Sequence, residues 1–299
     1  MDQRAELSEF LRSRRARLRP QDVGLPQLGR YRRVPGLRRE ELAQLAGVSV
    51  AYYTRLEQGN GRNVSTEVLD AIARALRLSE TERGHLTHLA KPKLKKERCV
   101  RRPKQLRPGV RHLLDAMEGV VPAYVLGPSL DILGWNRLAR ALLGDFAALP
   151  PQERNMARLV FLDPNSPDLY VDWESKATDV VSALRIYAGC AADDPQLTAL
   201  IGELSVKSEE FRMLWAAHTV QDKGHGTKRL RHPLVGELTL SCEALQLSGE
   251  HELTMVTYQA EPGTPSADSL RLLAGWGTDG AEGAEGGDGA DTAADADAA

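Results

Sequence analysis

The sequence predicts an all-α domain of five helices, followed by an α+β domain with an antiparallel sheet and a disordered acidic tail. Three observations lead to this prediction. Apolar residues recur at helical spacing as far as about residue 90. Beyond residue 110, alternating segments typical of strands stand on both sides of long helical patterns. After Trp276 the chain contains no large apolar residue, so it cannot bury enough surface to offset its ordering entropy.

Charge divides the chain at about the same place. Residues 1–107 contain 25 Lys and Arg against 12 Asp and Glu, a net charge of +13, and the remainder contains 14 against 29, a net charge of −15. The total of −2 therefore conceals a polarised molecule. A half this basic favours a phosphate-bearing partner, because each Lys or Arg that neutralises a phosphate releases counterions.

These boundaries define four segments, which are residues 1–90 (the helical domain), 91–107 (a basic linker), 108–276 (the α+β domain) and 277–299 (the acidic tail). The first helix is expected over about 7–18, with Leu7, Phe10 and Leu11 inward and its arginines, Arg14 among them, outward. A Pro-, Gly- and Arg-rich loop follows. Its Arg30, Arg32 and Arg33 either follow DNA or are simply solvated.

The second and third helices carry the most informative pattern. Leu42, Leu45 and Ala46 form an apolar stripe, and Gly47 then allows a sharp turn at positive φ. Ser49 is a good N-cap for the third helix. A short helix, a glycine turn and a second helix with an exposed front edge is the helix-turn-helix plan, in which the second helix enters the major groove. A helical hairpin has the same apolar spacing, but the basic surroundings favour DNA.

The DNA-binding residues expected from this plan begin with Arg38 and Arg39, because arginine binds phosphate or the guanine edge in bidentate fashion. Arg62 and Asn63 precede the fourth helix, whose N-terminus favours phosphate. Glu57 is expected to be structural. The front of the recognition helix consists of Ser49, Val50, Ala51, Tyr52, Thr54 and Arg55.

The fourth and fifth helices are expected to begin after Ser65 and Ser79, and Glu82 completes a capping box with the second serine. In the α+β domain we expect strands at 122–128, 131–136, 237–247 and 252–260, and helices at 110–117, 136–144, 172–189 and 195–218. The segment 224–228 lacks the spacing of a phosphate-binding loop and is interpreted as a flexible loop.

Residues 42–59 closely resemble the helix-turn-helix of the Xre/Cro family, which has a lambda-repressor-like fold. The matching residues are Leu42-Ala43, Gly47-Val48-Ser49, Tyr53, and Leu56-Glu57-x-Gly59. The run from Arg33 to Ala43, followed by Tyr52 to Gly59, resembles the actinobacterial branch, which often has a C-terminal MmyB-like ligand-binding domain. The second half resembles the PAS-like fold of that domain at residues 124–126, 131–136, 159–163 and 231–236.

The resemblance implies that the second domain binds a small, partly apolar, fatty-acid-like ligand. The residues that we expect in its pocket are Tyr124, Trp135, Arg185, Arg212, Trp215 and His218, the cations serving a carboxylate and the aromatics a wall. Aromatic residues at this spacing are also ordinary core residues. We find no catalytic or metal-binding set, so we expect neither an enzyme nor a bound cofactor.

The expected function is therefore a ligand-sensing transcriptional regulator that binds operator DNA as a homodimer. The alternatives are a C-terminal domain that is a protein-interaction module, and, with least support, an enzyme fused to a DNA-binding domain. Cys99, Cys190 and Cys242 are odd in number and far apart, and no signal peptide or membrane-spanning segment is evident. We expect a cytoplasmic protein without a membrane partner.

Overall fold

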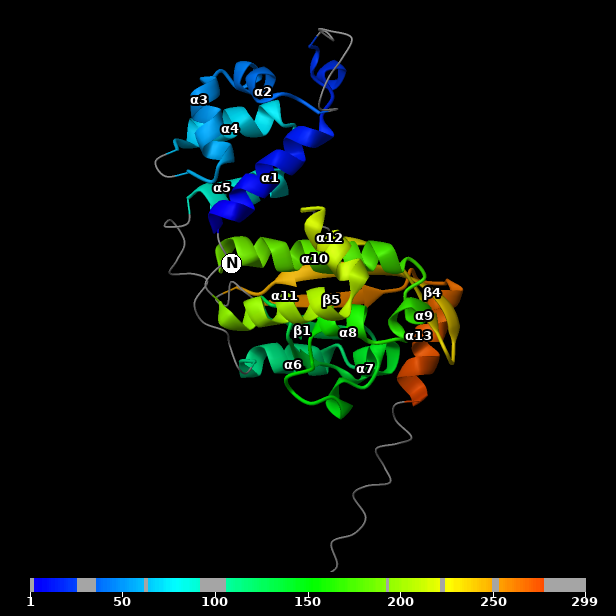
Figure 1. Ribbon diagram of the computed structural model, residues 1–299. Helices are drawn as coiled ribbons and strands as arrows, with labels where there is room; N and C mark the ends of the chain where they lie inside the picture. The colour runs from blue at the N-terminus through cyan, green and yellow to red at the C-terminus, as the bar shows by residue number, and fades with distance from the viewer. Residues whose placement is uncertain are drawn as a thin grey trace, which may run out of the picture.

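The computed structural model describes residues 3–25, 36–61, 64–91, 106–191, 194–220, 224–248 and 253–276. The chain forms a helical N-terminal domain and a C-terminal domain built on a five-stranded sheet, which lie against each other (Figure 1). The predicted fold class is confirmed. The predicted linker, except for its ends, and the predicted acidic tail lie outside the described residues.

The N-terminal domain contains the five expected helices around one core. Its buried side chains include Phe10, Leu42, Tyr53 and Ile72, all 0% exposed. A short 3-10 helix, η1 (Pro20–Val23), follows the first α-helix. The bounds are α1 (Gln3–Arg17), α2 (Arg39–Leu45), α3 (Val50–Glu57), α4 (Thr66–Ala75) and α5 (Glu80–Ala90).

Three serines set the starts of these helices, as predicted. The Oγ atoms of Ser49, Ser65 and Ser79 accept hydrogen bonds from the backbone N–H three residues onward, at 3.1, 3.3 and 3.2 Å. Each bond satisfies an otherwise unpaired N–H of the first turn. Leu45 departs from expectation: Leu42 and Ala46 are buried, but Leu45 lies at the edge of the stripe and is 37% exposed.

The C-terminal domain is a mixed layer of helices around an antiparallel sheet with strand order β2-β1-β5-β4-β3. Its strands are β1 (Ala123–Leu126), β2 (Ile132–Trp135), β3 (His225–His232), β4 (Gly236–Gln246) and β5 (Thr254–Gln259). Its helices are α6 (Pro108–Ala116), α7 (Arg137–Leu143), α8 (Met156–Leu162), α9 (Ser166–Leu169), α10 (Trp173–Cys190), α11 (Pro195–Lys207), α12 (Glu209–Ala216) and α13 (Pro265–Trp276), with a 3-10 turn η3 (Phe146–Ala148).

The two faces of the sheet are covered differently. One face carries Leu230, Leu238 and Tyr258 and packs against the larger core, which includes the inward side chains of α7, α8 and α10. The opposite face packs Val125 and Met255 against α6 in a separate small core. The larger layer of helices is the one that meets the N-terminal domain (Figure 1).

Two predictions about this domain are wrong. The segment 224–228 is mostly part of strand β3, whose alternating Arg229 and Arg231 point outward while Leu230 is buried. The single helix expected at 195–218 is two helices, because the Ser208 side chain caps a new helix at Phe211 N, 3.1 Å away. The segment 159–163, which resembles the MmyB-like domain, lies mainly in helix α8.

Candidate DNA-binding and ligand-binding sites

The helix-turn-helix has the geometry that the sequence predicts. Gly47 stands at φ +65° between α2 and α3, a conformation that only glycine adopts without strain. The backbone N–H of Val48 donates to the Ala43 carbonyl at 3.0 Å, which closes the turn. Tyr53 and Leu56 point into the core of the domain, at 0% and 2% exposure. The opposite edge of α3 is therefore presented to the outside.

The residues expected to bind DNA mostly lie on that exposed edge. Val50 is 43% exposed, and Arg38, Ser49, Ala51 and Arg55 are also exposed. Tyr52 and Thr54 are half-buried beside them, and the Arg55 guanidinium lies 5.9 Å from the centre of the Tyr52 ring. Arg62 and Asn63 lie outside the described residues.

Arg39, which the sequence predicts to bind DNA, also pairs with a carboxylate of its own domain. Its Nε lies 3.2 Å from Oε2 of Glu57, a carboxylate that is 0% exposed. Arg15 of α1 donates to the same carboxylate through Nη2 at 2.8 Å. Burial raises the pKa of Glu57, but hydrogen bonds from Arg15 and Arg39 outweigh it and the pKa is lowered. Glu57 is thus structural, and it ties α1, α2 and α3 together.

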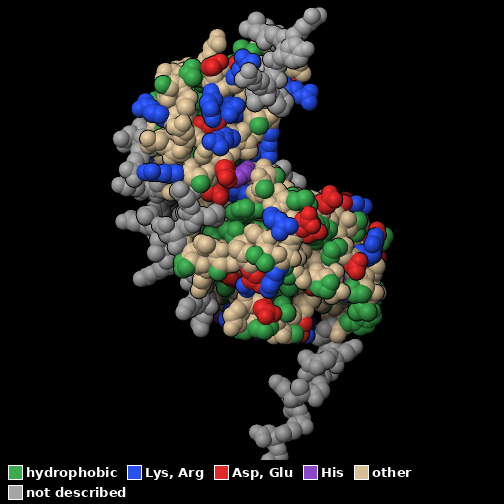
Figure 2. Space-filling view, viewed as in Figure 1, with side chains coloured by type: hydrophobic (Ala, Val, Ile, Leu, Met, Phe, Trp, Pro, Cys, Tyr) green, Lys and Arg blue, Asp and Glu red, His purple; other side chains and the backbone are tan. Residues whose placement is uncertain are grey.

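The surface around this motif is basic. Figure 2 shows Lys and Arg side chains gathered on the N-terminal domain. Arg39 remains 42% exposed despite its pairing, and Arg12 remains 55% exposed. Exposed guanidinium groups beside a helix edge of small and hydrogen-bonding side chains can bind both phosphate and base edges.

Arg55→Ala should weaken binding to a duplex selected by the wild-type protein by about 1–3 kcal/mol if Arg55 contacts a base, and should relax specificity at one position. Arg55 is exposed, so the fold should be unchanged. Fluorescence anisotropy at fixed salt measures the loss. The matched control is Arg111→Ala, which removes an exposed arginine from α6 of the other domain. Equal affinities for the two variants would contradict this assignment of the recognition helix.

The C-terminal domain contains a cavity of about 540 Å³ between α7, α8, α9 and the end of β3. Its wall is mainly apolar, and the polar side chains that line it are Asp163, Asn165, Ser166, Asp168, Arg231 and His232. His232 is held by its neighbours, with Nε2 2.9 Å from the Ala141 carbonyl oxygen and Nδ1 accepting from the Leu234 N–H at 3.2 Å. The principal apolar side chains of the wall are Leu142, Phe146, Met156, Leu159, Leu169 and Tyr170.

Two of the residues expected at a ligand pocket stand directly behind this wall. The Trp135 ring packs edge-to-face on Phe146 with 5.4 Å between ring centres, and the Tyr124 ring lies 6.4 Å from the same phenylalanine. Neither side chain lines the cavity itself. They support Phe146, which does.

Three other expected pocket residues lie elsewhere. Arg185, Trp215 and His218 meet one another at the contact with the N-terminal domain, outside the lining of the cavity. Arg185 Nη1 lies 3.0 Å from Oε2 of Glu6 in α1. The remaining residue expected at the pocket, Arg212, is exposed and donates to the Ser205 carbonyl at 3.2 Å. The structure therefore separates the six residues into a pair behind the cavity wall, a group of three at the domain contact and an exposed arginine.

Sequence reasoning missed most of the cavity wall and the N-terminal half of the domain contact. Arg14 was expected to face outward, but it is 3% exposed, and its Nη2 donates to the His218 carbonyl at 2.5 Å. An arginine at the edge of an apolar helix stripe carries no signal that another domain will cover it. Phe146 and Met156 likewise show no periodicity that distinguishes a cavity wall from a filled core.

Comparison with protein families matches both domains. A helix-turn-helix domain model matches residues 6–86, and the model of the MmyB-like transcription regulator ligand binding domain matches residues 106–273. A comparison with curated proteins finds no match. The fold and the two sites define a transcriptional regulator that has a DNA-binding domain and a ligand-binding domain. Because the second match covers more than half of the chain, the protein belongs to the MmyB-like transcription regulators.

Both matching families are regulatory. Within the described part of the chain, no group of three or more His, Cys, Asp or Glu side chains is arranged to hold a metal ion. Among the same residues, no helix is both long and apolar enough to cross a membrane.

Proposed function

We propose that this protein binds specific DNA through α3 and senses a small, partly apolar ligand in the cavity of its C-terminal domain. The cavity carries the proposal. Its volume of about 540 Å³ lies in the range of small-molecule sites, and its wall is mainly apolar with a few polar groups. Protein cores are close-packed and contain few voids larger than a water molecule, so the packing of the domain does not account for this space.

A mainly apolar wall with Arg231 among its polar groups favours an amphipathic ligand such as a fatty acid. Arg231 pairs with Glu237 at 2.9 Å, but the two side chains are 58% and 61% exposed. A surface ion pair of this kind contributes little to stability, so a ligand carboxylate competes with Glu237 at small cost. The alkyl chain then contacts Leu142, Met156 and Leu159.

Leu159→Trp should abolish ligand uptake, because the larger side chain fills the cavity that Leu159 lines. Dodecanoic acid serves as the probe, with binding followed by titration calorimetry and native mass spectrometry. The matched control is Val206→Trp on α11, where the side chain is 82% exposed and the change should leave uptake intact. Circular dichroism and thermal unfolding establish that both variants fold.

Equal uptake by the two variants would place the ligand elsewhere in the chain. No uptake of dodecanoic acid, and no co-purified small molecule in the wild-type protein, would overturn the sensor function in favour of a protein-interaction module.

The same native spectra test the proposed homodimer. One recognition helix reads only a few base pairs, so we propose two copies on an inverted repeat in a cytoplasmic regulator. A monomer at micromolar concentration bound to one half-site would contradict this assembly.

A further inference from the structure

The two domains share a packed contact as well as a linker. Helices α1 and α5 face α10 and the turn that follows α12 (Figure 1). Val220, at the end of that turn, is 2% exposed and belongs to the core of the N-terminal domain, where Ile186 of α10 also packs. The His85 ring of α5 lies close above Gly189 of α10, where an added Cβ would come within 3.1 Å of it.

Arg185 is the centre of this contact. Its side chain is 1% exposed, and Nη1 reaches both Oε2 of Glu6 at 3.0 Å and Nδ1 of His218 at 2.9 Å. Nη2 donates to the Trp215 carbonyl, and the guanidinium lies 4.1 Å from the centre of the Trp215 ring. One cation from α10 therefore joins α12 to α1.

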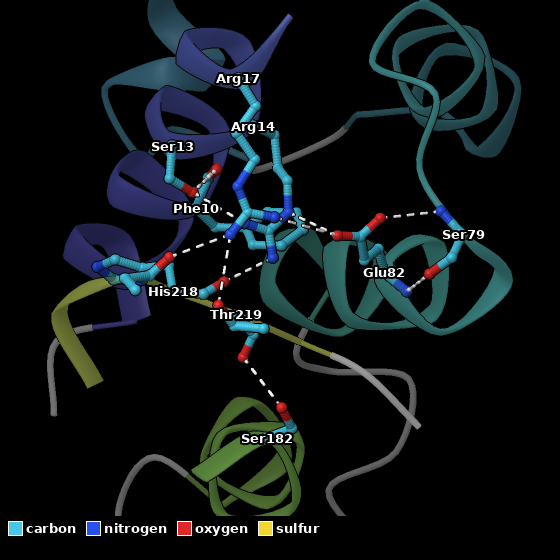
Figure 3. Close-up of polar contacts among 10 residues, drawn as sticks. Phe10, Ser13, Arg14, Arg17, Ser79, Glu82, Ser182, His218 and Thr219 are labelled. Carbon is cyan, nitrogen blue, oxygen red and sulfur yellow. Dashed lines mark hydrogen bonds and ion pairs between the residues drawn. The ribbon is translucent and has the colours of Figure 1, made fainter. Parts of the chain in front are cut away.

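The turn after α12, residues 217–220, is held from the other side by α1. Figure 3 shows Arg14 and Arg17 reaching from α1 to this turn. Arg14 donates to the His218 carbonyl, and Arg17 Nη2 lies 3.3 Å from the Ala217 carbonyl oxygen. His218 adopts φ +50°, an uncommon backbone conformation for a residue other than glycine, and its Nε2 lies 2.9 Å from Oε2 of Glu9.

The charge state of His218 fits these partners. Burial and the nearby Arg185 charge lower the pKa of His218 to about 4, so the ring is neutral at pH 7. A neutral ring with its proton on Nε2 donates to Glu9 Oε2 at 2.9 Å. Its Nδ1 then accepts from Arg185. Both ring nitrogens therefore have a hydrogen-bond partner at the contact between the two domains.

A series of contacting aromatic rings leads from this contact to α8, one of the helices of the cavity wall. Trp215 stacks on Phe211 at 5.6 Å between ring centres, and Phe211 packs edge-to-face on Phe161 at 5.1 Å. Phe161 belongs to α8, the helix that also contributes Met156 and Leu159 to the cavity wall. A displacement of α8 by an occupant of the cavity therefore acts on the ring stack, because close-packed interiors transmit displacement.

We propose that the turn after α12 couples the cavity to the DNA-binding domain, with Arg185 as the positioning residue that joins Trp215 to α1. A buried ion pair requires good geometry, so a shifted Trp215 costs the Arg185–Glu6 pair much of its energy. Helix α1 in turn holds α3 through the Arg15–Glu57 pair. In the docked arrangement α1 contacts Arg185 and the turn after α12, and in a displaced arrangement it does not. A ligand alters DNA affinity to the extent that it binds these two arrangements differently.

The first test compares Arg185→Met and Arg185→Lys with Arg229→Met in the full chain. Arg229 is a matched control, since its pair with Asp172 at 2.7 Å is about half exposed and lies outside the domain contact. The readout is the ratio of DNA affinities with and without dodecanoic acid at fixed salt. The wild type and Arg229→Met should show the same ratio. Both Arg185 variants should bring it towards one while retaining dodecanoic acid affinity, since lysine cannot make all of the arginine contacts at once.

The second test needs no ligand. Phe211→Leu shortens the ring stack within the C-terminal domain, and amide hydrogen exchange of residues 3–17 reports whether α1 remains docked. Loss of a buried contact should accelerate exchange there by about tenfold or more in Phe211→Leu and Arg185→Met, and not in Arg229→Met. The ligand part of the inference rests on the proposed function. If the wild type binds no dodecanoic acid, that function fails and hydrogen exchange alone decides the coupling. Unchanged protection of the α1 amides from exchange in both variants overturns the coupling. It is also overturned if Arg185→Met keeps the wild-type ratio of DNA affinities with and without dodecanoic acid.

Discussion

Glu57→Gln is expected to destabilise the DNA-binding domain by about 3 kcal/mol, because it removes one partner of a buried ion pair. Glu57 is 0% exposed and is the shared anion for Arg15 and Arg39. The substitution keeps the size of the side chain, so the loss reports charge rather than packing. Urea unfolding followed by circular dichroism measures it.

Glu40→Gln is the matched control, because Glu40 belongs to the same helix as Arg39 and is exposed. Its effect should be within about 0.5 kcal/mol. The two variants should also differ in acid. The pKa of Glu57 is lowered from 4.5 in the fold, so its stabilisation is present above pH 4.5 and is lost as the pH falls through the folded value. An equally steep loss of stability in acid for wild type and Glu57→Gln would contradict this role.

Gly59→Ala is expected to destabilise the same domain by about 3 kcal/mol or more, through both backbone strain and collision. Gly59 stands at φ +84°, and an added Cβ would come within 2.3 Å of the Arg4 carbonyl oxygen of α1. The colliding atom belongs to the backbone, so α1 itself must move. Because Arg14 and Arg17 of α1 also hold the second domain, DNA binding and domain docking should both suffer.

Gly47→Ala separates strain from collision. Gly47 also has a positive φ, +65°, but an added Cβ meets no atom within 4 Å among the described residues. Only the conformational cost of about 1–2 kcal/mol should remain. Thermal and urea unfolding of both variants, measured side by side, test the difference. Equal losses would mean that α1 yields to the alanine and does not pack tightly on the end of α3.

Local signals account for what the sequence predicted well. The serine caps before α3, α4 and α5 act within a single turn, and the turn at Gly47 depends on one backbone conformation, so neighbouring residues suffice to reveal them. The position of α11 and α12 was also evident, but Ser208 was hidden in a long helical pattern. A serine within such a pattern is compatible with either a helix interior or a new cap.

Strand β3 was missed for a related reason. It lies at the edge of the sheet, and its Lys228, Arg229 and Arg231 resemble a solvated loop. Pairing with β4 over its whole length, from His225 to His232, makes it a strand. The charged residues of β3 do not favour a strand by themselves, so the pairing could not be predicted from them.

The two domains, the exposed edge of the helix-turn-helix and the opposite charges of the two halves were predictable from the sequence, because each depends on periodicity, caps or composition. The family was predictable from the resemblance of residues 42–59 to known helix-turn-helix motifs. The partners of the buried cations became clear only from the way the two domains pack. Arg185 and His218 look like free ligands for a carboxylate along the chain, yet the carboxylates that they meet are Glu6 and Glu9 of the other domain. A charged side chain binds whichever partner the fold brings within reach, and more than 170 positions separate Arg185 from Glu6.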